Sequence, residues 1–227
     1  MAARIACVLT VLIVTTYAAT ARDAKIGAVT VDLMAPQGYC ELVESNASDA
    51  RTLNAIRTVL GSQTDLLAMY ADCAQHDGWR GGTRPLLDDF VQYQAIASLK
   101  NANLEAAGAI AEACKTIRAQ AGQSMSETLA EFNKRAALVL NGVKFNETKF
   151  LGVAAEDDTA CYAALLQKLT TEVGTEKTQA ILLAITVAKA RAVHYVMYTP
   201  YAGADMITRM LARHKINVAA FLAANKR

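Results

Sequence analysis

Four cysteines limit how this chain can fold, because paired cysteines would tie distant segments of it together. They follow an apolar N-terminal segment and are spread through the sequence, at Cys40, Cys73, Cys114 and Cys161. An even number of cysteines in an exported chain is typical of disulfide bonds. Three pairings are possible, and we favour Cys40 with Cys73 and Cys114 with Cys161, because these are sequence neighbours. Each bond would close a loop of roughly 30–50 residues and stabilise the fold by about 3–4 kcal/mol.

The first 21 residues predict export. Arg4 is the only charge before an apolar, small-residue stretch at 5–19, and Ala19-Thr20-Ala21 supplies the small residues typical of a signal-peptidase site before Arg22. The alternative is an uncleaved anchor, but the stretch is shorter than the ~20 residues that span a bilayer. We therefore expect residues 1–21 to be a signal peptide. The mature protein would be periplasmic or secreted, with no membrane span.

The composition is that of a globular protein. Hydrophobic residues make up 53% of the chain, and 23 Lys and Arg against 21 Asp and Glu give a net charge of +2. High hydrophobicity with a small net charge excludes a disordered chain. No run of five basic residues occurs, which argues against a nucleic-acid partner. No linker or repeat interrupts residues 22–227, so we expect a single domain there.

The hydrophobic pattern predicts an α+β fold. Helices are expected at 49–60, 99–119, 124–139 and 204–225, and strands at 28–33, 66–73, 89–96, 149–155, 159–169, 179–188 and 192–198. The alanine-rich segment 180–192 could instead be a buried helix. Four consecutive strands after a pair of helices favour a mostly antiparallel sheet covered by helices, an α/β sandwich, over a doubly wound parallel sheet.

Residues 74–85 are predicted to be a polar loop between two strands, and they supply most of the candidate binding residues. The candidates are Asp72, His76, Trp79, Arg80 and Arg84. Asp72 and His76 could orient one another for acid–base chemistry or share a metal, and the two arginines could hold a carboxylate or phosphate. The alternative is structural: the acid and histidine flank a disulfide and the arginines are surface charges. Glycines inside the loop favour binding over a fixed catalytic geometry.

Motifs of common catalytic and cofactor sites are absent. The sequence has no G-x-S-x-G, P-loop, G-x-G-x-x-G, H-E-x-x-H or C-x-x-C. We therefore expect no catalytic residues, no cofactor and no metal. His194, inside a strand, and His214, on the apolar stripe of the last helix, are expected to be packed rather than to act as ligands.

Several short motifs carry a resemblance. Gly38-Tyr39-Cys40, Tyr70-Ala71-Asp72-Cys73, Trp79-Arg80, the strand with Tyr93, and Tyr198-Thr199-Pro200-Tyr201 before a last helix resemble a set of small exported bacterial proteins with no assigned function. The resemblance covers about residues 28–225 and implies a bacterial envelope protein, but supplies no activity. The element order is similar to that of the PsbP-like α/β sandwich, an analogy of topology.

These observations favour a soluble, non-catalytic protein of the cell envelope that binds a partner protein or a small ligand. The alternative is a small-molecule hydrolase, or another enzyme, that uses residues 72–84. An enzyme would need the side chains of Asp72, His76 and Arg80 to converge on a concave pocket.

Export predicts a defined N-terminus. Intact-mass measurement of the protein from its native host should show a chain that begins at Arg22, because the Ala19-Thr20-Ala21 site would be cleaved. A mature protein that keeps residues 1–21 would contradict the prediction.

Overall fold

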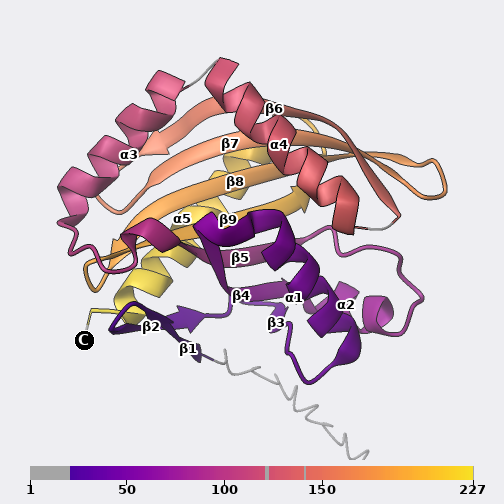
Figure 1. The fold of residues 1–227 in the computed structure, drawn as a ribbon, viewed down its shortest axis with the longest axis horizontal. Coiled ribbons are helices and arrows are strands. Elements are labelled where there is room, and N and C mark those ends of the chain that lie inside the picture. Colours follow the sequence, from indigo (N-terminus) through magenta and orange to yellow (C-terminus); the bar gives the residue numbers. More distant parts are fainter. Residues whose placement is uncertain (1–20, 121–122, 141, 227) are drawn as a thin grey trace, which may run out of the picture.

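The computed structural model describes residues 21–120, 123–140 and 142–226. The expected signal peptide lies outside the described residues except for Ala21. The fold is α+β, as expected, and is built on a seven-stranded sheet in which every neighbouring pair is antiparallel (Figure 1). The order across the sheet is β3-β4-β5-β9-β8-β7-β6, and β1 and β2 form a separate hairpin.

The strands of the main sheet are β3 (Tyr39–Glu41), β4 (Thr64–Asp72), β5 (Phe90–Ile96), β6 (Val143–Glu156), β7 (Cys161–Thr171), β8 (Glu176–Ala188) and β9 (Arg191–Pro200). The hairpin consists of β1 (Ala21–Ile26) and β2 (Val29–Met34). The helices are α1 (Ala47–Leu60), α2 (Cys73–Arg80), α3 (Ala106–Gln120), α4 (Gln123–Val139) and α5 (Met206–Ala224), with short 3-10 turns at Gly61–Gln63 and Ala97–Leu99. The four-strand meander β6–β9 was expected, and its alanine-rich third strand is not a helix.

Side chains alternate between the two faces of the sheet, and different elements cover each face. One face packs against α5 and the β1–β2 hairpin, with a core rich in aromatic residues that includes Tyr70, Tyr93, Tyr162, Tyr195 and Phe221. Helices α1, α3 and α4 cover the other face (Figure 1). Their cover is divided: α3 packs over β6–β8, whereas α1 packs over β4.

Both disulfide bonds are present in the favoured pairing. Cys40–Cys73 joins β3 to the start of α2, and Cys114–Cys161 joins α3 to β7. Cys114 and Cys161 are fully buried, so the second bond is also part of the core between α3 and the sheet.

The prediction of a loop at 74–85 is wrong in its first half, where α2 forms. The carboxylate of Asp72 accepts a hydrogen bond of 2.8 Å from the Ala74 backbone N–H, which caps the helix N-terminus. Residues 81–89 then lead irregularly into β5. The helix expected at 99–119 begins only at Ala106, where Glu105 caps it through the backbone N–H groups of Ala107 and Gly108.

The two histidines outside α2 occupy packed positions. His214 is fully buried beside the rings of Tyr162 and Tyr195, with centroid distances of 5.8 and 4.7 Å, and burial lowers its pKa to about 3. His194 lies on β9, and burial lowers its pKa to about 4. Both rings are therefore neutral at pH 7.

Removing the buried disulfide should destabilise the protein strongly. Replacing Cys114 and Cys161 together with alanine should lower the free energy of unfolding by roughly 2–5 kcal/mol, because the unfolded chain regains the freedom of a long loop. The sequence separations of the two bonds are similar, 47 and 33 residues, so the double variant of Cys40 and Cys73 is a matched comparison. Denaturant unfolding measures both losses, and an unchanged unfolding midpoint would contradict the prediction.

Candidate ligand-binding cavity

A cavity of about 680 Å³ lies between α1, α4 and the face of the sheet that these helices cover. Most of its lining is apolar or aromatic. From the helices come Ala55, Ile56, Val59, Leu60, Phe132 and Val139, and from the sheet come Met69, Phe90, Phe145, Leu169 and Tyr198. Trp79, Pro85, Leu86 and Leu87 line it from α2 and from the segment that follows.

The amphipathic sequence of α1 builds one wall. The Asn46 side chain caps this helix by accepting hydrogen bonds from the backbone N–H groups of Ser48 and Asp49, at 3.0 and 3.2 Å. Leu53 packs with Met69 in the core under the helix. Ala55 and Ile56 are half-buried at the cavity. Helix α1 thus contacts the sheet along one side and borders the cavity along the other.

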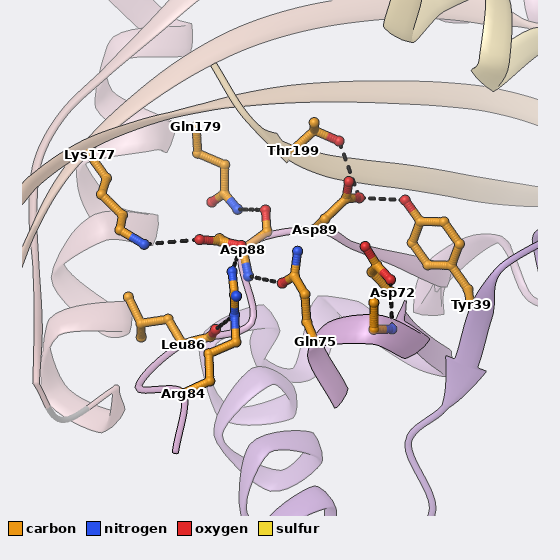
Figure 2. Close-up of polar contacts among 11 residues, drawn as sticks. Tyr39, Asp72, Gln75, Arg84, Leu86, Asp88, Asp89, Lys177, Gln179 and Thr199 are labelled. Atoms are coloured by element: carbon orange, nitrogen blue, oxygen red, sulfur yellow. Dashed lines mark hydrogen bonds and ion pairs between the residues drawn. The ribbon is translucent and has the colours of Figure 1, made fainter. Parts of the chain in front are cut away.

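Asp88 ties the segment between α2 and β5 to the sheet (Figure 2). Its carboxylate accepts hydrogen bonds from Arg84 at 2.7 Å and from Lys177 on β8 at 2.9 Å, and its backbone oxygen accepts one of 3.1 Å from Gln179. Burial works to raise the pKa of Asp88, but the hydrogen bonds from Lys177 and Arg84 outweigh it and hold the pKa below its ordinary value. Asp88 is therefore charged at neutral pH and fixes this wall of the cavity.

Asp89 makes a second set of connections at the same point. Its carboxylate accepts a short hydrogen bond from the Tyr39 hydroxyl and one of 3.3 Å from Thr199 (Figure 2), and Arg213 on α5 lies 3.4 Å away. Burial and the hydrogen bond to Asp89 raise the pKa of Tyr39. The two adjacent acids thus connect strands β3, β8 and β9 and helix α5 at the start of β5.

Two of the candidate residues, His76 and Arg80, hold a buried carboxylate on α1. Arg80 donates two hydrogen bonds to Asp49, which is fully buried, and one of them, from Nε to Oδ1, is 2.9 Å long. Burial works to raise the pKa of Asp49, but hydrogen bonds from Arg80 and the Val43 backbone N–H outweigh it and lower the pKa. Nε2 of His76 lies 3.5 Å from Asp49 Oδ1, and burial followed by the charge of Arg80 lowers the pKa of this histidine. This cluster joins α1 to α2.

The other three candidates lie apart from that carboxylate. Trp79 stacks on His76 with a centroid distance of 6.2 Å and lines the cavity. Arg84 binds Asp88 and the backbone oxygen of Leu86, and Asp72 caps α2. The five residues therefore do not converge on one point, and Trp79 alone among them lines the cavity. Whether they bind a partner stays a prediction.

Sequence reasoning missed the polar residues inside the cavity. Gln92, Gln167 and Gln179 lie on three strands, are almost fully buried and line the cavity. The sequence signal that could have identified them is a glutamine at a strand position where an apolar side chain is expected. A buried amide needs hydrogen-bond partners, so such a glutamine indicates a polar site in the interior. The sequence also gave no sign that Asp49 would be buried.

The described residues contain neither a cluster of metal ligands nor a helix suited to span a membrane. Within residues 21–120, 123–140 and 142–226, no group of three His, Cys, Asp or Glu side chains is placed to hold a metal ion. No helix in these ranges is both long and apolar enough to cross a membrane.

Comparisons with known proteins add little. No protein-family model matches the chain, and no curated protein matches it. Among solved structures, the Ran-binding protein Mog1p of Saccharomyces cerevisiae is similar at 12% sequence identity, with 92% of this chain and 93% of that chain covered and a TM-score of 0.34. A likeness this weak carries no argument about fold or function.

Loss of Arg80 should destabilise the protein because it leaves Asp49 buried without its main partner. We expect Arg80→Ala to lower the free energy of unfolding by about 3 kcal/mol, the usual cost of breaking a buried pair. Arg57→Ala is the matched control, because Arg57 and Glu44 form an exposed pair whose loss costs about 1 kcal/mol or less. Denaturant unfolding at pH 7 measures both, and equal losses would contradict the prediction.

The same variant should also change the acid response. The lowered pKa of Asp49 means that its ion pair stabilises the fold above its ordinary pKa of about 3.8, and that this stability is lost as the pH falls through the folded-state pKa. Arg80→Ala should therefore lose less stability between pH 5 and pH 2 than the unmodified protein does.

Proposed function

We propose that this protein is an exported, non-catalytic binding protein of the cell envelope that holds a small, mainly apolar molecule in the cavity. The observation that carries the proposal is the cavity itself. Its volume of about 680 Å³ lies within the range of about 300–1,000 Å³ typical of small-molecule sites. Its lining is mainly apolar and aromatic, with three glutamines and the charged residues Arg51, Asp88, Glu176 and Lys177.

The placement of Trp79 favours a small ligand over a partner protein. A tryptophan beside an arginine suggested an anchor for a protein interface. Instead, Trp79 lines the cavity, and Arg80 donates hydrogen bonds to Asp49. Trp79 therefore contributes aromatic surface to the cavity between the helices and the sheet.

The arrangement of the acidic and basic groups favours binding over catalysis. A hydrolase that used residues 72–84 would need Asp72, His76 and Arg80 to meet at a pocket. None of these three lines the cavity, and each has a structural partner: Asp72 caps α2, while the other two contact Asp49. His76 is also buried beside Asp49 and does not line the cavity, so a molecule in the cavity does not reach its ring.

Export is supported by the N-terminal pattern and by the disulfides. Residues 1–21 have the order of a signal peptide, and two disulfide bonds are typical of proteins that mature in an oxidising compartment. The resemblance to small exported bacterial proteins points to the same compartment. The mature protein would then bind its ligand in the periplasm or outside the cell.

Narrowing the cavity should weaken binding while the fold is retained. Ala55 lines the cavity from α1, so Ala55→Trp would place a large side chain in that space. Pyrene, an apolar fluorescent probe, should bind the unmodified protein saturably and bind the variant roughly tenfold more weakly, a change of about 1.4 kcal/mol. Fluorescence titration measures both.

The control is Ala130→Trp, because Ala130 is exposed on α4 and does not line the cavity. This variant should bind pyrene as the unmodified protein does. Absence of saturable pyrene binding, or equal weakening by both substitutions, would contradict the proposed function.

A further inference from the structure

Two glutamines form a polar pair on the floor of the cavity. Gln167 on β7 and Gln179 on β8 are directly opposite one another in the antiparallel ladder, and both line the cavity. Residues in this relation have Cβ atoms about 4.5–5.5 Å apart, so their side chains stand next to each other on the same face. Only 2% and 7% of the two residues are exposed.

The amide nitrogens of both glutamines are engaged by the protein. Nε2 of Gln167 donates to Asn133 Oδ1 at 3.1 Å and to Thr148 Oγ1 at 3.2 Å. Nε2 of Gln179 donates to the backbone oxygen of Asp88 at 3.1 Å (Figure 2). The partner of Gln179 is a backbone oxygen, which only accepts, so it fixes the nitrogen end of that amide. In the network of Gln167, Thr148 Oγ1 donates to Asn133 and accepts from Gln167.

The amide oxygens of both glutamines have no hydrogen-bond partner among the described residues. Although both residues are buried, neither oxygen is among the fully enclosed, unpartnered polar atoms of the described residues, so both are accessible from the cavity. An acceptor in that position can gain a hydrogen bond from a ligand. The two residues are cross-strand neighbours, and they belong to a cavity whose lining is mainly apolar. They therefore form a site for a group that donates hydrogen bonds.

The charges around the pair favour an uncharged donor over an ion. The carboxylate of Asp88 is already bound by Arg84 and Lys177. The other charged residues of the lining, Arg51 and Glu176, are exposed, whereas both glutamines are buried, so the described lining has no buried, unpaired charge to balance an ion. An anionic group would meet two carbonyl oxygens with their negative ends towards it. A hydroxyl or amide N–H fits both constraints.

We propose that the ligand is an uncharged, mainly apolar molecule whose hydroxyl or amide N–H donates one hydrogen, shared between the side-chain oxygens of Gln167 and Gln179 in a three-centre hydrogen bond. This inference rests on the proposed function and adds the chemical class of the ligand. The apolar body of the ligand would lie against Phe90 and Tyr198, whose rings stack 4.3 Å apart and line the cavity.

Three probes with the same apolar body test the donor requirement. The probes are 1-pyrenemethanol, which donates a hydrogen bond, 1-pyrenecarboxaldehyde, which only accepts, and 1-pyrenecarboxylate, which is charged. We expect the unmodified protein to bind the alcohol about tenfold more tightly than the aldehyde, because the aldehyde leaves both oxygens unpaired. The carboxylate should bind more weakly than either.

Gln167→Met tests the assignment to this pair. The substitution removes the oxygen but keeps the length of the side chain, and Thr148 and Asn133 still bond to each other at 3.1 Å. The variant should lose the preference for the alcohol and keep its affinity for the aldehyde.

Thr186→Val is the matched control, because Thr186 is a buried polar residue on β8 that does not line the cavity and whose hydroxyl bonds, among the described residues, only to the Thr159 backbone oxygen. It should keep the preference. Equal binding of alcohol and aldehyde by the unmodified protein, or an unchanged preference in Gln167→Met, would overturn the inference while leaving the proposed function intact. If none of the three probes nor pyrene binds, the proposed function itself fails.

Discussion

A sheet that is buried on both faces imposes the main constraint on this molecule. Alternate side chains of each central strand point to opposite faces of the sheet. Each apolar face must therefore be packed against other helices or strands. Helix α5 and the β1–β2 hairpin cover one face, where four tyrosines and Phe221 pack. On the other face the cover is divided among α1, α3 and α4, and the cavity lies where α1 and α4 meet the sheet. The location of the candidate site follows from this unequal cover.

Paired charges, rather than apolar contacts alone, hold the walls of the cavity in place. Asp49 joins α1 to α2 through Arg80, and Asp88 joins the segment before β5 to β8 through Lys177. Both carboxylates have lowered pKa values because hydrogen bonds outweigh the effect of burial. Asp49 is fully buried, so removing Arg80 would be strongly destabilising, whereas the pair of Asp88 and Lys177 is partly exposed and acts as a link between two segments. The cavity can then persist without side chains that fill it.

The sequence predicted the elements well where one physical signal dominated. Alternating apolar residues specified the meander β6–β9, and the even number of cysteines led to both disulfide bonds. Helix α2 was missed because Gly78 and the polar residues around it are typical of a loop, whereas the capping contact of Asp72 favours a helix. At residues 73–80 the composition favours a loop, whereas the capping residue favours a helix. The helix forms, because local packing supports it.

The cavity could not be predicted from the sequence, because its walls come from residues that are far apart in the chain. Ala55, Phe132 and Gln167 become neighbours only when α1, α4 and β7 assemble. Of the candidates chosen from sequence, Trp79 borders this space, and the four polar residues beside it have structural partners. A dense group of charged residues in a sequence can therefore mark the supports of a site instead of the site itself.

Keeping such a cavity has a cost in stability. Lining atoms beside a void lose dispersion contacts with the atoms that would otherwise fill it. The two disulfide bonds offset this loss in a way that does not depend on packing, because they act mainly by restricting the unfolded chain. Cys40–Cys73 joins β3 to α2, and Cys114–Cys161 joins α3 to β7, so the bonds fasten helices to the same face that contains the cavity. The crosslinks thus let this fold retain a large internal space that packing alone would favour closing.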